Sequence, residues 1–342
     1  MKTEQLKTAL NRGTFTPVYL VLGQESALIE EVRALFKATL STEEMTMNFA
    51  SYDLAQTEVA RALEDAESAP FFGERRIVFM QNPFFLTGEK VKTKLDHDLK
   101  GFQAYLEQPQ PTTALVIFAP YAKLDERKKI VKQLKKMATV IDVQKINERQ
   151  VQQLVTAQLQ SEQVTIEPAA MTLLLSKTNG DYSQIMAELP KLLLYAQQSR
   201  VITETAVSAL VASSIEDNVF ELVPLVLQKK VGPVLEMYHD LLLQKEEPLK
   251  INAILLGQFR LLLQVKILFE KGYSQGNLAS VLKIHPYRIK LALQQIRHFS
   301  KATLAQAYLG LEGIEEKIKT GQGEATLLFE LFMLQFATDD VA

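Results

Sequence analysis

The sequence contains no cysteine. This absence excludes disulfides, thiolate catalysis, iron–sulfur clusters and cysteine-ligated zinc sites together. Histidine is also scarce, and the four that are present, His97, His239, His285 and His298, are scattered without the spacing of metal ligands. We therefore expect no metal site and no cofactor held by these residue types.

Long apolar runs and an apolar N-terminal segment are missing as well. Residues 1–5 are polar, unlike the apolar core of a signal peptide. A membrane-spanning helix needs ~20 apolar residues. The longest candidate, residues 251–265, is shorter and contains Gln258 and Arg260. We expect a cytoplasmic protein with no membrane partner.

Length and charge set further bounds. A chain of 342 residues is too long for one typical core and suggests two or three domains. Hydrophobic residues make up 47% and charged residues 23%, as in an ordinary globular protein. The net charge of −2 gives no overall attraction to nucleic acid, so contact with DNA would have to come from local basic patches.

Strand and helix signals alternate over the first 143 residues. Buried-type strands are expected at residues 17–23, 48–52, 77–80, 113–119 and 139–143. Helices are expected between them at residues 25–39, 56–67, 96–107 and 124–137. This alternation predicts a parallel sheet covered by helices on both faces.

After Val143 the strand signals cease and every long segment is predicted to be helical. Asn179-Gly180 is a helix-stop signal, and the small polar pair Ser213-Ser214 is a plausible hinge. We therefore predict three domains: an α/β domain over 1–143, a small helical domain over 144–213 and an all-α domain over 214–342.

The machinery of an ATPase is missing where this layout would place it. A P-loop needs further glycines, a lysine and a hydroxyl after the first strand, but the sequence continues Gly23-Gln24-Glu25-Ser26 with none of these in place. The strand at 113–119 ends in Ala119-Pro120, where an acidic pair would hold the metal. No nucleophile elbow or catalytic carboxylate pair stands out. We expect no intrinsic catalysis and no catalytic residues.

Two adjacent phenylalanines, Phe71 and Phe72, lie between Pro70 and Gly73, where a helix gives way to a strand. Adjacent side chains cannot share one face of a helix or a strand, so one of the pair is expected to be exposed unless something covers it. The pair could seal the seam between a helix and the sheet. Alternatively, it could be an apolar tip offered to a partner protein. The residues alone leave both readings open.

Two basic segments could contact DNA. Residues 123–136 hold seven lysines and arginines and could follow a phosphate backbone, although a solvated helix face explains the run more simply. Residues 273–290 resemble a helix-turn-helix, with Arg288, Lys290 and Arg297 available for DNA. Helical bundles produce this second pattern by accident, and Ile289 and Leu291 indicate a helix that is partly core.

The whole pattern resembles the δ subunit of bacterial DNA polymerase III. In chain order, the resemblance is carried by Tyr19-Leu20-Val21-Leu22-Gly23-Gln24-Glu25 with Leu28-Ile29-Glu30-Glu31, Pro70-Phe71-Phe72-Gly73-Glu74-Arg75-Arg76, Leu124-Asp125-Glu126-Arg127-Lys128-Lys129, Asn179-Gly180-Asp181-Tyr182 with Glu188-Leu189-Pro190-Lys191-Leu192, Gln258-Phe259-Arg260-Leu261-Leu262 and Ile284-His285-Pro286-Tyr287-Arg288. The absence of cysteine and of a lysine after Gly23 separates the chain from the δ′ and ATP-binding subunits of the same complex.

The resemblance implies a fold and a function. The fold would be an AAA+-like α/β domain with a degenerate nucleotide site, followed by a helical lid and a helical collar for oligomerisation. The chain would bind the β sliding clamp and open one of its interfaces. Its partners would be the ATP-binding (τ/γ) and δ′ subunits and primer–template DNA, within a DNA-directed DNA polymerase holoenzyme.

The resemblance also assigns contact residues. Clamp contact maps onto Phe71 and Phe72, flanked by Pro70 and Gly73, with Glu74, Arg75 and Arg76 as a charged rim. Candidate DNA contacts are Lys317, Lys319 and Arg288. Two rival hypotheses remain, a DNA-binding regulator that uses the helix-turn-helix-like segment and a working ATPase.

Overall fold

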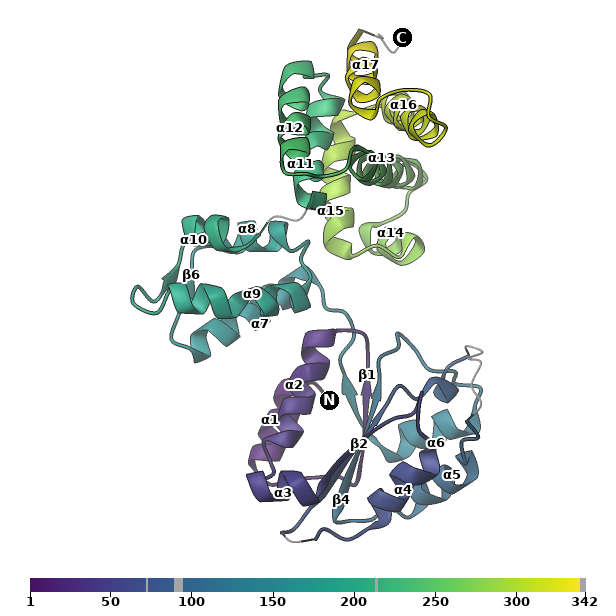
Figure 1. The fold of residues 1–342 in the computed structure, drawn as a ribbon. Helices are drawn as coiled ribbons and strands as arrows, with labels where there is room; N and C mark the ends of the chain where they lie inside the picture. The colour runs from purple at the N-terminus through teal and green to yellow at the C-terminus, as the bar shows by residue number, and fades with distance from the viewer. Residues whose placement is uncertain (72, 89–94, 213–214, 339–342) are drawn as a thin grey trace. The chain divides into compact units, whose positions relative to one another are not determined.

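The computed structural model describes residues 1–71, 73–88, 95–212 and 215–338. The chain folds into two compact units, Met1–Ile146 and Asn147–Ala342. Each has its own buried core. In Figure 1 the first unit is coloured purple to blue and the second teal to yellow. The division into three domains, with boundaries at 143/144 and 213/214, stays a prediction.

A five-stranded sheet forms the centre of the N-terminal unit. All of its neighbouring strands are parallel, and their order is β2-β3-β4-β1-β5. The strands are β1 (Val18–Leu22), β2 (Phe49–Asp53), β3 (Arg76–Gln81), β4 (Thr113–Ala119) and β5 (Thr139–Asp142). The predicted parallel sheet is confirmed.

Helices cover both faces of this sheet (Figure 1). Helices α1, α2 and α3 lie on one face, and α4, α5 and α6 lie on the other. Their bounds are α1 (Thr3–Asn11), α2 (Ser26–Lys37), α3 (Thr42–Met47), α4 (Val59–Glu67), α5 (Leu99–Glu107) and α6 (Lys129–Met137), with a short 3₁₀ helix η1 (Phe84–Leu86) before α5. Helices α1 and α3 were not predicted, and α3, with six residues, is too short for apolar periodicity to identify it.

The central strands are apolar throughout because both of their faces are buried. On the α2 side, Tyr19, Phe79 and Phe118 pack with Phe36 of α2 in a chain of edge-to-face rings, with centroids 4.9 to 6.3 Å apart. The alternate residues of the same strands, such as Leu115, join a second apolar cluster under α4, α5 and α6.

The predicted helix starts at 56, 96 and 124 are too early, and for the last of them the reason is local. Helix α6 begins at Lys129 rather than at Leu124. The Asp125 carboxylate accepts the Arg127 backbone N–H at 3.1 Å and holds the intervening residues in a turn. Short polar side chains compete in this way with the helical backbone bonds.

The C-terminal unit contains a small two-stranded parallel sheet, which corrects the prediction of helices alone after Val143. Strand β6 (Thr165–Ile166) pairs with β7 (Val201–Ile202). Strands of two residues are too short for an alternating pattern to reveal them. The helices around this pair are α7 (Glu148–Ser161), α8 (Pro168–Lys177), α9 (Tyr182–Tyr195) and α10 (Glu204–Leu210).

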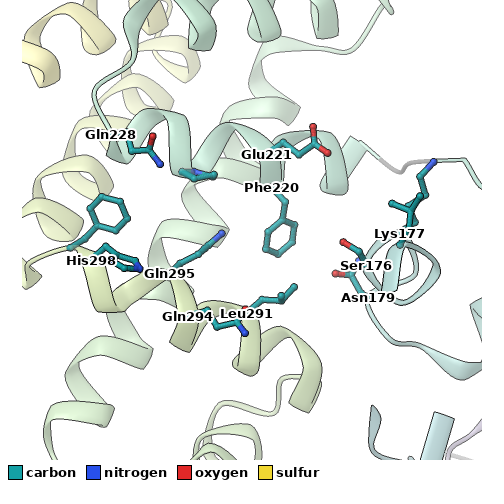
Figure 2. A pocket seen from close by; sticks show the side chains of 13 residues that line it. Ser176, Lys177, Asn179, Phe220, Glu221, Gln228, Leu291, Gln294, Gln295 and His298 are labelled. Carbon is teal, nitrogen blue, oxygen red and sulfur yellow. The ribbon is translucent and has the colours of Figure 1, made fainter. Parts of the chain in front are cut away.

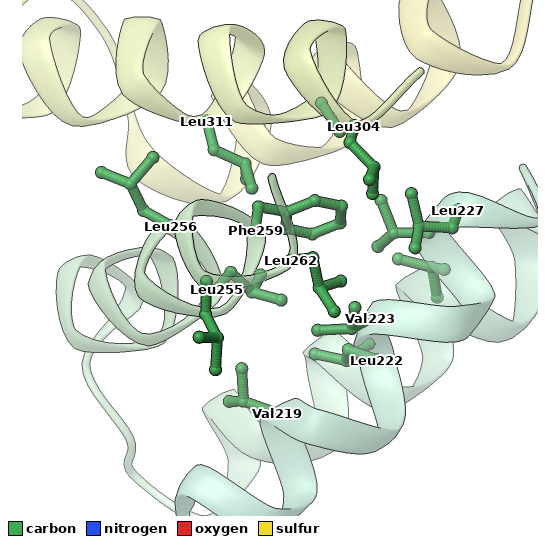
Figure 3. Close-up of a cluster of buried hydrophobic side chains, with 14 of the residues drawn as sticks. Val219, Leu222, Val223, Leu227, Leu255, Leu256, Phe259, Leu262, Leu304 and Leu311 are labelled. Atoms are coloured by element: carbon green, nitrogen blue, oxygen red, sulfur yellow. The ribbon is translucent and has the colours of Figure 1, made fainter. Parts of the chain in front are cut away.

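The rest of this unit is a helical bundle built around α13. The bounds are α11 (Ile215–Leu227), α12 (Val231–Leu243), α13 (Pro248–Glu270), α14 (Gln275–Leu282), α15 (Pro286–Gln295), η2 (Ile296–His298), α16 (Lys301–Lys319) and α17 (Ala325–Thr338). Helix α13 packs against α11, α14, α15, α16 and α17. Figure 3 shows the core between α11, α13 and α16, where Val223, Phe259 and Leu304 point toward one another.

Helix α13 is long and apolar enough to cross a membrane, judged by length and composition. Half of its most apolar stretch is buried inside the bundle. It also carries buried polar side chains, and Asn252 donates from Nδ2 to the Leu311 carbonyl of α16 at 3.1 Å. Burial and an interhelical hydrogen bond are features of the central helix of a bundle.

Candidate partner-binding site

The loop that joins α4 to β3, residues 68–75, presents a strongly exposed aromatic ring. The Phe71 side chain is 72% exposed. Within the described part of the N-terminal unit, the other exposed large apolar side chains, Met1, Met47 and Met137, are between 40% and 46% exposed. Phe71 therefore does not seal the seam between a helix and the sheet.

The structure describes three of the four predicted clamp-contact residues. Pro70 is half-buried, Phe71 and Gly73 are exposed, and Phe72 lies outside the described residues. Pro70 follows the end of α4, and Gly73 has a positive φ of 76°. Phe71 thus lies in the loop that follows α4.

Helix α3 and the residue that ends it support this loop. The Asn48 side chain is fully buried, and its Oδ1 accepts the Phe71 backbone N–H at 2.7 Å. Gly73 lies against Glu44, so that a Cβ atom at position 73 would lie 2.1 Å from Glu44 Oε1. Glycine is favoured at this position by its positive φ, whereas the Glu44 carboxylate is the end of a flexible side chain that can shift.

A capping box starts α3. The Ser41 backbone N–H donates to Glu44 Oε2 at 2.8 Å, and the Glu44 backbone N–H donates to Ser41 Oγ at 3.2 Å. Ser-x-x-Glu is the sequence signal from which this short helix could have been predicted. No sequence signal connects Asn48 to Phe71, because their contact joins positions 23 residues apart.

Two of the three residues of the predicted charged rim are held by contacts within the N-terminal unit. Glu74 is exposed. The Arg75 guanidinium stacks over the Phe15 ring, 3.6 Å from its centroid, and donates to a backbone carbonyl. Arg76 pairs with Asp65 at 2.5 Å and is largely buried. Both arginines are therefore engaged within the unit, which leaves Glu74 as the freely exposed member of the three.

At the end of β1, where a P-loop would bind phosphate, the backbone is tightly packed. Gly23 has φ +146°, and a Cβ atom there would lie 2.1 Å from the backbone carbon of Val143. The Glu25 backbone N–H donates to the Val143 carbonyl at 3.0 Å, and α2 begins at the next residue. The connection is too short and too closely packed to cradle a phosphate through several backbone N–H groups.

The helix-turn-helix-like segment corresponds to α14 and α15. Arg288 lies with its guanidinium carbon 5.3 Å from the centroid of the Phe220 ring. Lys290 donates from Nζ to both carboxylate oxygens of Glu148, at 2.8 and 3.0 Å. Ile289 is buried in the bundle core. A recognition helix needs its basic side chains free for DNA, so these contacts count against the regulator hypothesis.

The other candidate DNA contacts, Lys317 and Lys319, lie in the last turn of α16. Both are exposed. Lys319 pairs with Glu315 one turn earlier on the same helix. The structure thus places the two ammonium groups at one end of α16, and their role in DNA contact stays a prediction.

The basic run at 123–136 forms α6 and the turn before it. The hydrogen bond from the Arg127 side chain lowers the pKa of Asp125 to about 2. Lys135 pairs with Glu126 at 2.5 Å, and Lys128 donates to the Phe85 carbonyl at 2.7 Å. The exposed lysines that remain are Lys123, Lys129, Lys132 and Lys136. Apolar residues of α6 are buried on its other side, as expected for a helix with a solvated face.

The C-terminal unit contains a cavity of about 630 Å³ (Figure 2). It is lined from α8, α11, α15 and η2, with apolar side chains such as Phe220 and Leu291 beside the amides of Gln294 and Gln295. No sequence motif predicted this cavity. Among the described residues, no group of three or more histidine, aspartate or glutamate side chains is placed to hold a metal ion.

Comparison with known proteins decides the family. A family model described as DNA polymerase III, delta subunit, matches residues 19–144, and one for the C-terminal domain of the same subunit matches residues 216–336. The DNA polymerase III subunit delta of Bacillus subtilis (strain 168) is 40% identical over 328 residues, which cover 96% of this chain and 94% of that protein. The chain belongs to the DNA polymerase III delta subunit family.

Two further relatives of this delta subunit family agree in sequence and fold. The probable DNA polymerase III subunit delta of Aquifex aeolicus (strain VF5) is 24% identical over 315 residues, covering 90% of this chain and 88% of that one. The solved structure of the Bacillus subtilis DNA clamp loader delta protein matches with a TM-score of 0.76 and 39% identity, covering 98% of this chain and all of that one. The predicted α/β fold with a parallel sheet, followed by helical regions, is confirmed.

Proposed function

We propose that this chain is the delta subunit of a bacterial clamp loader, which binds the β sliding clamp and opens one of its interfaces. Membership of the delta subunit family supports this proposal, as does the description of the solved relative as a DNA clamp loader delta protein. The observation that carries the clamp contact is the 72% exposure of Phe71 in the loop between α4 and β3.

An exposed aromatic ring at this loop suits a protein partner. Burying Phe71 and Phe72 in an apolar pocket would provide roughly 3–6 kcal/mol of gross hydrophobic free energy. Binding energy in protein interfaces is concentrated in a few buried side chains of this kind. The exposed Glu74 beside them would lie at the polar rim.

Opening follows from differential binding. A ligand shifts a two-state ring only if it binds the open form more tightly than the closed form. The chain would therefore capture a clamp in which one interface has separated. Because the end of β1 is closed against phosphate, ATP would act on the neighbouring τ/γ subunits, which assemble with this chain and δ′ around primer–template DNA. Detectable ATP binding by the purified chain would revive the ATPase hypothesis.

Clamp binding by the purified chain tests the proposal. We expect wild-type binding and a loss of at least ~100-fold in affinity for the double variant Phe71→Ala, Phe72→Ala. Met137→Ala, which removes an exposed apolar side chain from α6 of the same unit, is the matched control and should bind like wild type. Undiminished binding by the double variant would overturn the assigned contact.

Clamp opening needs a separate readout. A pair of fluorophores placed across one clamp interface should separate when the wild-type chain is added, and should stay together when the double variant is added at the same concentration. Tight binding without separation of the fluorophores would contradict the opening step and leave the contact standing.

A further inference from the structure

We propose that Asn48 is a positioning residue for the clamp contact: its side chain fixes the backbone at Phe71, so that the aromatic ring is held ready for the partner. This inference rests on the proposed function of Phe71. It assigns to α3 the role of a platform for the loop, and it adds to the site a residue that would not touch the clamp itself.

Asn48 joins three parts of the N-terminal unit. Its backbone N–H donates to the Glu44 carbonyl of α3 at 2.7 Å, and its carbonyl accepts the Ile77 N–H of β3 at 2.8 Å. Its side-chain Oδ1 accepts the Phe71 N–H of the loop at 2.7 Å. The two backbone bonds hold the Asn48 backbone in place, and the side-chain bond then holds the backbone of Phe71.

Burial makes this third bond matter. Asn48 is fully buried, and a hydrogen bond shielded from water is stronger than the same bond in solvent. Replacing the side chain with a methyl group would leave the Phe71 N–H without this acceptor. The loop would then explore more conformations when free, and binding would have to restrict them again, which lowers affinity.

A second hydrogen bond close to the loop provides a control for the positioning role of Asn48. Gln110 donates from Nε2 to the Glu67 carbonyl at 3.2 Å. That bond holds the end of α4 just before the loop, whereas Asn48 bonds to the residue that carries the exposed ring. Gln110→Ala therefore removes a side-chain bond at the end of α4, next to the loop, without touching Phe71.

The first test uses the free protein and needs no partner. In wild type we expect the Phe71 amide proton to be protected from hydrogen exchange. Asn48→Ala should lose this protection, at least tenfold in rate, while Asn48→Asp, which keeps an acceptor oxygen, should retain most of it. Unchanged exchange at Phe71 in folded Asn48→Ala would overturn the inference.

The second test is a double-mutant cycle on sliding-clamp binding. Asn48→Ala should weaken binding about tenfold, Asn48→Asp less than threefold and Gln110→Ala less than twofold. In a Phe71→Ala background, Asn48→Ala should have less than a twofold further effect, because the ring that it positions is gone. Circular dichroism and the unfolding midpoint of each variant show whether the chain remains folded.

The outcomes separate this inference from the proposed function. If Phe71→Ala weakens clamp binding and folded Asn48→Ala does not, the positioning role is wrong and the proposed function stands. If Asn48→Ala weakens binding equally with and without Phe71, its effect is structural and the inference is also wrong. If neither substitution weakens binding, the proposed function is wrong and the inference falls with it.

Discussion

Gly180, in the turn between α8 and α9, packs directly on Tyr287 of α15. A Cβ atom at position 180 would lie 3.1 Å from both Cβ and Cγ of Tyr287, and the Gly180 backbone has a positive φ of 66°. Two motifs that are more than 100 positions apart in the sequence therefore meet within the C-terminal unit. The contact explains why the turn carries glycine in addition to its role in ending α8.

Replacing this glycine should destabilise the C-terminal unit. Gly180→Ala adds a methyl group against Tyr287 in a left-handed backbone conformation, which should cost about 1–2 kcal/mol of unfolding free energy. Denaturant unfolding measures the change. The matched control is Gly257→Ala, in the interior of α13 with no atom within 4 Å of the added Cβ, which should stabilise by about 0.5–1 kcal/mol. A neutral Gly180→Ala would contradict both the cost of the left-handed backbone and that of the contact with Tyr287.

A methyl group at the end of β1 should be far less tolerable. In Gly23→Ala the added Cβ would lie 2.1 Å from the backbone of Val143, which cannot turn aside as a flexible side chain can. We expect a loss of at least ~3 kcal/mol in the stability of the N-terminal unit. Gly13→Ala, also at positive φ but with nothing within 4 Å, should cost only about 1 kcal/mol by the same measurement. Equal costs would contradict the packing at β1.

Acid should weaken the N-terminal unit through His97. Burial, partly offset by Glu58 and Asp96, lowers the pKa of His97 below its ordinary value of 6.5. Its Nδ1 accepts the Val59 N–H at the start of α4 at 3.2 Å, which requires the neutral ring. The unfolded chain therefore binds the proton more readily than the folded chain. The stabilisation that neutral His97 gives the folded unit is complete above pH 6.5 and is lost as the pH falls through the folded pKa.

Unfolding midpoints at pH 7.5 and 5.5 measure this effect. We expect the midpoint of the wild type to fall more between these two pH values than that of His97→Gln, which offers an amide acceptor and does not titrate. An equal fall in both proteins would assign the acid sensitivity to other groups.

Asp65 should control the titration of Tyr52. The Tyr52 hydroxyl donates to Asp65 Oδ2 at 2.5 Å. Burial, together with this bond, raises the pKa of Tyr52 to about 12. Asp65→Asn removes the carboxylate charge and leaves the burial, so the pKa of Tyr52 should fall to between 10 and 12. Titration followed by NMR of the tyrosine ring resolves the change, and an unchanged pKa would mean that burial alone sets it.

Met47 should add a smaller contribution to clamp binding. It is 46% exposed at the end of α3, next to the residue that bonds to Phe71. Truncation of a half-exposed methionine should weaken binding about 3–10-fold, less than the loss expected for the phenylalanine pair. The measurement compares the clamp affinity of Met47→Ala with that of Met137→Ala, since Met137 is 45% exposed on another helix. Equal affinities for the two variants would place Met47 outside the contact.

The sequence by itself determined the architecture of the N-terminal sheet and the family of the chain. Strands such as Thr113–Ala119 are apolar on both faces and short, and they alternate with amphipathic helices, so local periodicity was sufficient to predict a covered parallel sheet. The absence of a P-loop lysine after Gly23 could also be read directly from the sequence. Helix α3 and the β6–β7 pair were too short to show a periodic apolar pattern.

The tertiary structure decided which side chains are available. The sequence offered Phe71, Arg76 and Arg288 as candidate contact residues. In the structure Arg76 pairs with Asp65 and Arg288 lies over Phe220, whereas Phe71 remains exposed. It also revealed that Asn48 supports Phe71. Burial and pairing depend on residues brought together from distant parts of the chain, and periodicity records only near neighbours. That is why the apolar pair could be found by reading the sequence, but its support could not.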